Sequence, residues 1–213
     1  MYPDIEFLAR GTGVRSLTPA GYDAAVDRIV PAALELAAAG ADAVMVIGTS
    51  LTFYRGPEAH ERLLATLRAE TGLPVSTMSQ AVVDGLRELG AEEIAVATAY
   101  TDVVNDRLRD LLEHHGLRVR ALEAFGITEF GDGVIRRSPE EIVELAVSAA
   151  EAAPAAEAVL VSCGGLQTLR TVVPIETRTG LPVVTSTQAA FRAALRLVGA
   201  DTRLEGFGRL LAA

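Results

Sequence analysis

Hydrophobic and polar positions follow two periods along the chain, one typical of helices and one typical of buried strands. Short continuous apolar runs, each ended by a glycine or a hydroxyl residue, indicate strands of a parallel sheet. We expect such strands at 43–47, 73–77, 93–98, 118–124, 159–162 and 181–185. Amphipathic stretches between them predict helices at 20–39, 57–71, 80–89, 102–115, 139–152 and 189–198. This alternation predicts an α/β chain with parallel sheets.

Two local signals sharpen the helix ends. Ser138 is followed three residues later by Glu141, which is the spacing of a capping box. Gly72 follows the apolar pattern of its helix directly, as expected for a glycine that ends a helix. The glycine-rich segment 125–137 has neither period, and we expect it to be irregular.

The chain contains an internal repeat. "TGLPVSTMSQA" from Thr71 matches "TGLPVVTSTQA" from Thr179, and "AVMVIGTSL" from Ala43 matches "AVLVSCGGL" from Ala158. "TGLP" alone could be a common turn between a helix and a strand. Two segments that match in the same order favour a repeat instead. We therefore expect two pseudo-symmetric lobes, the first formed by 1–91 with 186–213 and the second by 92–185, with the site in the cleft between them.

The repeat aligns Gly48 with Cys163, and it aligns Thr49 and Ser50 with the two glycines that follow the cysteine. Both segments come directly after the carboxyl end of a strand, where open α/β sheets bind ligands. We predict a site with a thiol on one wall and a glycine on the other.

The repeat also predicts that one element is absent. The second lobe begins with the strand 93–98, whereas the chain starts at Met1 with no counterpart in the first lobe. We expect a leading strand and its loop, about 20 to 25 residues, to be missing. Its absence would expose the edge of the first sheet and leave the site open on one side.

Composition excludes several classes of function. The formal net charge of −9 argues against nucleic acid as a partner, because phosphate binding requires clustered lysine and arginine. No apolar run reaches the roughly 18 residues of a membrane span, and Met1 does not begin a signal peptide. The single cysteine cannot form an internal disulfide, which suits a reducing compartment. We expect a cytoplasmic protein without a membrane partner.

Cys163 has two interpretations. A free cysteine is often only a small buried apolar side chain, but its place at a strand end before two glycines favours a functional thiol. Thr49 and Ser50 would donate hydrogen bonds to an anion, and no G-x-S-x-G elbow marks Ser50 as a nucleophile. Tyr100 would either reach the same cleft or lie at the edge of the core.

The three histidines carry weaker signals. His114 and His115 are adjacent in a helix and face different ways, so they make a poor metal pair and are expected to stabilise the helix end. His60 lies between Glu58 and Glu61, and we expect it to be solvated. No P-loop or dinucleotide fingerprint is present, and we expect no cofactor and no metal.

Several segments together resemble one family. They are "GTSLTFYRG" from Gly48, "ATAYTDVVNDRL" from Ala97, "GIT" from Gly126, "SCGGL" from Ser162 and "GFGRL" from Gly206. The combination resembles the arylmalonate decarboxylase family of the aspartate/glutamate racemase-like superfamily, near the maleate cis-trans isomerases. Racemases and isomerases of that superfamily carry one cysteine in each lobe. The glycine in the first lobe here is similar to the decarboxylases instead.

The resemblance implies a cofactor-independent decarboxylation of α-aryl malonates to enantioenriched 2-arylalkanoates. A dioxyanion hole would hold the retained carboxylate, and Cys163, as a thiol with a pKa of about 8.5, would protonate one face of the enediolate. The implied donors and their neighbours are Thr49, Ser50, Tyr100, Gly48, Gly164 and Gly165. The implied apolar pocket for the leaving carboxylate contains Val14, Leu17, Tyr22, Leu51 and, less directly, Phe130. The expected partner is a small dicarboxylate substrate, and we expect a monomer.

Two other functions stay open from the sequence. One is a racemase or isomerase of the same superfamily that uses Cys163 with a different base. The other is a non-catalytic module that binds carboxylates without turnover.

Overall fold

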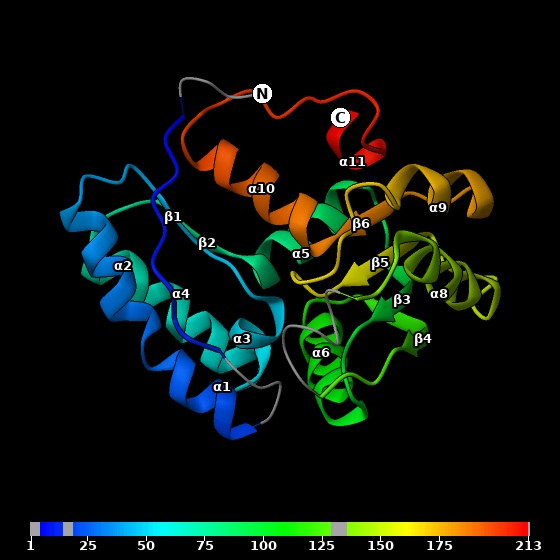
Figure 1. Cartoon of the computed structure of the whole chain (residues 1–213), viewed down its shortest axis with the longest axis horizontal. Coiled ribbons are helices and arrows are strands. Elements are labelled where there is room, and N and C mark those ends of the chain that lie inside the picture. Colours follow the sequence, from blue (N-terminus) through cyan, green and yellow to red (C-terminus); the bar gives the residue numbers. More distant parts are fainter. Residues whose placement is uncertain (1–4, 15–18, 129–135, 213) are drawn as a thin grey trace.

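The structure is a computed structural model that describes residues 5–14, 19–128 and 136–212 (Figure 1). Its strands form two parallel sheets with helices packed around them. The two-stranded sheet pairs β1 (Val44–Val46) with β2 (Val75–Thr77). The four-stranded sheet has the order β4-β3-β5-β6, with β3 (Glu93–Thr98), β4 (Arg118–Ala124), β5 (Ala158–Ser162) and β6 (Val183–Thr185). The predicted α/β class with parallel sheets is confirmed.

The helices of the described residues lie between and around these strands. They are α1 (Pro19–Val26), α2 (Ile29–Ala38), α3 (Thr49–Phe53), α4 (Pro57–Thr71), α5 (Met78–Glu88), α6 (Asp102–His114), α8 (Pro139–Glu151), α9 (Val172–Thr179), α10 (Ser186–Leu197) and α11 (Arg209–Ala212). Helix α4 and strands β3 and β4 have the predicted bounds. The predicted capping box is also present, because Ser138 Oγ accepts from the Glu141 N–H at 3.2 Å and the Glu141 carboxylate accepts from the Ser138 N–H at 2.8 Å.

One prediction about helices was wrong, and three short helices were missed. The single helix expected over 20–39 is divided into α1 and α2 by a turn at Asp27 and Arg28. Helices α3, α9 and α11 were not predicted, because each has too few residues to show a helical period. The division matters for the site, since α1 can take a direction that a continuous helix could not.

The two halves of the repeat fold alike. Gly72 and Gly180 both adopt the left-handed conformation after α4 and α9. Thr77 and Thr185 both end a strand, and their side chains accept the N–H of the glutamine three residues later, at 3.0 Å and 3.2 Å, to begin α5 and α10. The equivalent strands pair in the same parallel way. Repeated sequence therefore corresponds to repeated local structure.

Helices α5 and α10 pack against each other at the centre of the molecule (Figure 1). The carboxylate of Glu88 on α5 binds the guanidinium groups of both Arg192 and Arg196 on α10. Arg192 is buried, and these ion pairs hold the pKa of Glu88 down at about 2. Helix α10 also contacts β1 and β2, so the chain after β6 returns to the first sheet.

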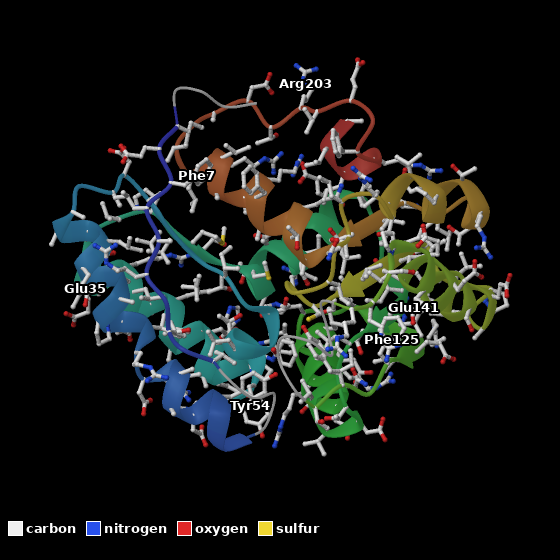
Figure 2. The ribbon with its side chains drawn as sticks, in the orientation of Figure 1. Phe7, Glu35, Tyr54, Phe125, Glu141 and Arg203 are labelled. Atoms are coloured by element: carbon white, nitrogen blue, oxygen red, sulfur yellow. The ribbon has the colours of Figure 1, made fainter. Side chains whose placement is uncertain are left out.

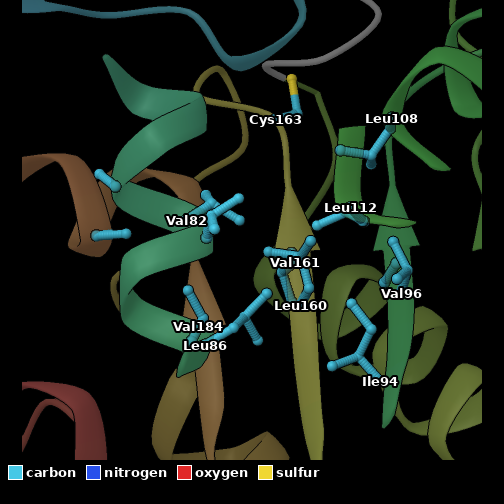
Figure 3. Close-up of a cluster of buried hydrophobic side chains, with 14 of the residues drawn as sticks. Val82, Leu86, Ile94, Val96, Leu108, Leu112, Leu160, Val161, Cys163 and Val184 are labelled. Atoms are coloured by element: carbon cyan, nitrogen blue, oxygen red, sulfur yellow. The ribbon is translucent and has the colours of Figure 1, made fainter. Parts of the chain in front are cut away.

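The core is one cluster of buried apolar side chains that runs through both sheets. Figure 3 shows its central part, where Val82 and Leu86 of α5 face Leu160 and Val161 of β5. Cys163 lies at the end of this cluster, beyond the carboxyl end of β5 (Figure 3). The packed core therefore fixes the strand end that carries the thiol.

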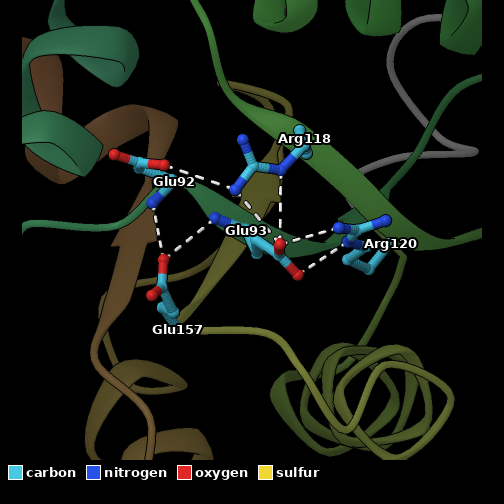
Figure 4. Close-up of polar contacts among 5 residues, drawn as sticks. All are labelled: Glu92, Glu93, Arg118, Arg120 and Glu157. Atoms are coloured by element: carbon cyan, nitrogen blue, oxygen red, sulfur yellow. Dashed lines mark hydrogen bonds and ion pairs between the residues drawn. The ribbon is translucent and has the colours of Figure 1, made fainter.

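The amino ends of the four-stranded sheet are tied by polar contacts (Figure 4). Glu93 binds Arg118 and Arg120 of β4, and Arg120 contributes most to lowering the pKa of Glu93 to about 2. The Glu157 carboxylate accepts the N–H groups of Glu92 and Glu93 at 2.7 Å and 3.0 Å. These contacts stabilise the sheet at the end opposite to Cys163.

The two sheets differ in whether they contain inner strands. Strands β3 and β5 each have a partner on both sides, whereas β1 pairs with β2 alone within the described ranges. None of the described helices could span a membrane, because none has a sufficiently long apolar stretch.

Candidate active site

Cys163 and Gly48 occupy equivalent strand ends and share an unusual backbone conformation. The φ angle is 156° at Cys163 and 126° at Gly48. Among the described residues, Cys163 is the one non-glycine residue with a positive φ. A side chain in this region costs about 1–3 kcal/mol and persists where the surroundings impose it, commonly at functional sites. The two equivalent strand ends thus differ in one respect: Cys163 carries a thiol and Gly48 carries no side chain.

The Cys163 thiol is a buried acid. The residue is 4% exposed, and burial raises the pKa of its thiol above the ordinary value. The N–H groups of Gly165 and Leu166 and the Tyr100 hydroxyl stabilise the thiolate and oppose this shift, but burial is the larger effect. The thiol therefore keeps its proton at neutral pH, which is the form that a general acid requires.

Tyr100 lies beside this thiol, just beyond the end of β3. It is buried, and its Oη is 3.3 Å from Ser162 Oγ at the end of β5. Burial holds the pKa of the Tyr100 hydroxyl well above its usual value, so it is a neutral hydrogen-bond donor. Its backbone is fixed because its N–H donates to Thr98 Oγ1 at 3.2 Å, and its ring packs edge-on against Phe53.

Thr49 and Ser50 begin α3, directly after Gly48, and both are buried. Thr49 Oγ1 donates to Ser186 Oγ at 2.9 Å, which joins α3 to the start of α10. Ser79 Oγ donates to the Thr49 carbonyl at 3.0 Å. These contacts fix the first turn of α3, whose N–H groups have no partner within the helix.

Tyr22 of α1 reaches the same region. Its side chain is buried, and its Oη has no hydrogen-bond partner among the described residues. Burial is the main cause that raises the pKa of Tyr22 to about 12; the nearby Ser50 hydroxyl, which lies outside hydrogen-bond geometry with Tyr22 Oη, opposes the shift, and the Cys163 charge adds to it. The Tyr22 hydroxyl is therefore a buried donor beside Ser50 and Cys163.

The remaining predicted residues vary in position. Leu51 is buried on α3, and Val14 is half-buried against the core. Gly165 is half-buried and Gly164 is exposed, with Met78 Sδ 3.0 Å from the place where a Cβ would lie on Gly164. Leu17 and Phe130 lie outside the described residues.

The prediction for His60 was wrong. His60 is 1% exposed, and its Nε2 is 2.7 Å from Thr77 Oγ1. Burial lowers the pKa of His60 to about 4. The flanking glutamates misled the sequence interpretation, because α4 turns the histidine toward β2 while Glu61 stays outside and binds His114. No group of three or more His, Cys, Asp or Glu in the described part of the chain could hold a metal ion.

Four contributors were missed in the sequence. Ser162 contacts the Tyr100 hydroxyl, and Ser186 accepts from Thr49. Tyr54 stacks on Tyr22, with ring centroids 4.7 Å apart. Arg55 binds Asp23 in α1, next to Tyr22. Ser162 directly precedes the cysteine, Ser186 lies in the repeated segment from Thr179, and Tyr54 and Arg55 lie in the segment from Gly48. Each therefore had a local signal, although none was predicted as a site residue.

The two parallel sheets, with their equivalent strand ends, place the chain in the aspartate/glutamate racemase-like fold. The maleate isomerase of Pseudomonas putida S16 shares this fold, with a TM-score of 0.85 at 24% identity over 93% of this chain and 82% of that one. The family model described as arylmalonate decarboxylase matches residues 1–211.

Individual relatives agree with the family model. Arylmalonate decarboxylase of Bordetella bronchiseptica is 44% identical over 211 residues, covering 99% of this chain and 88% of that protein. A liganded double mutant of arylmalonate decarboxylase, with one glycine changed to cysteine and one cysteine to serine, has a TM-score of 0.95 at 43% identity over 99% of this chain and 90% of the other. The chain therefore belongs to the arylmalonate decarboxylase family, and it is a carboxy-lyase.

Proposed function

We propose that this enzyme decarboxylates α-aryl malonates to 2-arylalkanoates, without a cofactor, and delivers the new proton from Cys163 to one face. The observation that carries this proposal is the asymmetry of the two strand ends. A buried thiol with a raised pKa stands at one end, and Gly48, without any side chain, stands at the other.

The retained carboxylate would be held by neutral donors. The hydroxyl groups of Thr49, Ser50 and Tyr100 are buried and lie near the two strand ends. When carbon dioxide leaves, the electron pair of the broken C–C bond spreads into an enediolate with charge on two oxygens. Fixed donors aimed at such charge contribute roughly 3–4 kcal/mol each. The aryl group delocalises the same electron pair, which makes an electron-sink cofactor unnecessary.

The leaving carboxylate would face apolar side chains. Leu51 is buried at the start of α3, and Val14 is half-buried against the core. A carboxylate that loses its hydration in such surroundings is favoured to depart as neutral carbon dioxide. The two carboxylates of the substrate would thus meet opposite environments, and only one of them would be lost.

Protonation would set the product's handedness. The Cys163 S–H bond breaks as its proton moves to the α-carbon, and the thiolate then regains a proton from solvent. Gly48 has no group that could protonate the opposite face. One enantiomer would therefore be formed, and a racemase would need an acid and a base on both faces.

Incubation with α-methyl-α-phenylmalonate tests the proposal through carbon dioxide release and chiral analysis of the product. We expect turnover with one enantiomer in excess. Cys163→Ser should keep substrate binding and lose the rate by about 10²–10⁴-fold, because a hydroxyl is a much weaker acid. Binding without turnover in the unaltered protein would identify a carboxylate-binding module instead. Deuterium exchange at the α-carbon of both enantiomers of an aryl acid would identify a racemase.

A further inference from the structure

Two consecutive residues after α3 hold two consecutive residues of α1. Tyr54 stacks on Tyr22, with ring centroids 4.7 Å apart and an interplanar angle of 26°. The next residue, Arg55, donates from Nε to Asp23 Oδ1 at 3.0 Å. Tyr54 is labelled in Figure 2, where it lies beside α1. Helix α3 begins with Thr49 and Ser50. One short segment therefore contributes hydroxyl groups at its start and contacts α1 through the two residues that follow it.

Arg55 makes further contacts that orient α1 as well as hold it. Its Nη1 donates to Asp27 Oδ1 at 2.9 Å, and its Nη2 donates to the Asp23 carbonyl at 3.3 Å. One planar guanidinium therefore binds two side chains four residues apart and the backbone carbonyl of the first, Asp23. A lysine ammonium could supply the charge but not this fixed fork.

Helix α1 depends on such contacts for its position. It has 8 residues and passes into the turn that separates it from α2. An isolated helix of this length is not stable in water, so tertiary contacts set its place. Exposed ion pairs contribute little to overall stability, and the Arg55 side chain is 38% exposed. Its contacts are thus better suited to fixing a direction than to stabilising the fold.

The object that these contacts position is the Tyr22 hydroxyl. It is buried and unpartnered among the described residues, in a region shared with Ser50 and Cys163. A buried donor without a partner costs free energy unless a ligand completes it. We propose that Arg55, together with Tyr54, is a positioning residue that holds α1 so that the Tyr22 hydroxyl points at the substrate. This inference rests on the proposed decarboxylase function.

The test compares Arg55→Gln with a matched control. We expect Arg55→Gln to lower kcat/KM for the arylmalonate by about tenfold or more, because displacement of a positioned group by about 1 Å can cost up to a hundredfold. Arg55→Lys should lose less than Arg55→Gln. Arg62→Gln is the control, since Arg62 and Arg55 both line one surface hollow, and Arg62 forms no ion pair among the described residues. The control should keep the rate and the melting temperature of the unaltered enzyme.

A double-mutant cycle separates positioning from simple loss of stability. In a Tyr22→Phe background, Arg55→Gln should change kcat/KM by less than twofold, because the group that Arg55 positions is already gone. An equal loss in both backgrounds, or no loss in either, would overturn the inference.

Amide hydrogen exchange gives a readout that does not need activity. Arg55→Gln should speed exchange of the amides of α1 at least tenfold and leave α4 unchanged, whereas Arg62→Gln should change neither. If arylmalonates are not turned over by the unaltered enzyme, the proposed function fails. The exchange experiment still decides the structural part, and unchanged exchange in α1 would overturn it.

Discussion

Gly48 and Cys163 stand at equivalent strand ends with similar backbone conformations, yet only one of them carries a side chain. The difference continues at the next position. Thr49 bonds to Ser186 of α10, whereas its counterpart Gly164 faces Met78 of α5, with Sδ 3.0 Å from where a Cβ would lie. One half of the repeat has therefore become a cradle of hydroxyl groups, and the other presents an acid. Two copies of one local structure therefore present different chemical groups at equivalent positions.

Moving the acid to the other half should produce the largest effect. The double variant Gly48→Cys, Cys163→Ser places the thiol on the opposite wall, and we expect it to form mainly the mirror-image product. The rate should fall by about 10²-fold or more, because the new acid is not optimally placed. Chiral chromatography of the product measures the outcome, with Cys163→Ser alone as the control. Formation of the original enantiomer would show that handedness is not set by the side on which the thiol stands.

Adding a second acid without removing the first should abolish the asymmetry. Gly48→Cys gives both strand ends a thiol, and we expect the variant to incorporate deuterium into both enantiomers of a 2-aryl acid. Its stability should fall by about 1–3 kcal/mol, because a side chain at positive φ is strained. The new Cβ would also lie 3.2 Å from Leu51 Cβ. Nuclear magnetic resonance in heavy water and urea unfolding measure the two effects. Selective exchange of one enantiomer would mean that the new thiol does not reach the α-carbon.

The halves also differ where a threonine caps a helix. Thr77 contacts His60 at 2.7 Å, whereas Thr185 contacts the amide of Gln188 at 3.4 Å. The folded pKa of His60 is about 4, below the ordinary 6.5, so folding favours the neutral imidazole. Its stabilising contribution is therefore complete above pH 6.5 and is lost as the pH falls from 6.5 toward 4.

This difference predicts acid sensitivity in one half. The free energy of unfolding should fall by roughly 2–3 kcal/mol between pH 7 and pH 4.5 through His60 alone. His60→Gln should lower stability at pH 7 but reduce this pH dependence, as urea unfolding at both pH values would show. His114→Gln, at an exposed position, is the control and should keep the full dependence. The same slope in His60→Gln and in the unaltered protein would assign the sensitivity to other groups.

The elements predicted correctly are those whose apolar residues recur with a regular period. The elements that were missed are short ones and those set by tertiary contacts. Strands β3 and β4 and helix α4 were predicted with their bounds, because their apolar patterns are long and bounded by turn signals. The repeat correctly aligned Gly48 with Cys163, since both positions follow a buried strand. The five-residue α3 was missed because it is too short to show a helical period, and the turn at Asp27 and Arg28 was missed because one helix was predicted across it.

The residues of the candidate site also fall into a predicted group and a missed group. Residues inside the repeated segments could be named from the sequence, as Thr49 and Cys163 show. Ser186 lies in the repeat and Arg55 in the segment from Gly48, but their contacts are with partners on other elements, so the sequence alone did not single them out. His60 was misplaced because neighbouring charges say little about the direction of one side chain on a short stretch of helix.

We expect the smallest effect from a change at Gly164, the residue that the repeat aligns with Thr49. Gly164→Ala would place a Cβ 3.0 Å from Met78 Sδ, and the flexible thioether can move away. We expect a loss of stability of about 1 kcal/mol or less, with Gly116→Ala as a comparison because no atom lies within 4 Å of its Cβ position but its φ is +82°. Gly164→Ala should lower kcat/KM more than Gly116→Ala does, because Gly164 adjoins the thiol. Gly116 follows α6 and lies far along the chain from Cys163. Equal activity in both variants would mean that the bare backbone at Gly164 is tolerated by the reaction and not required for it.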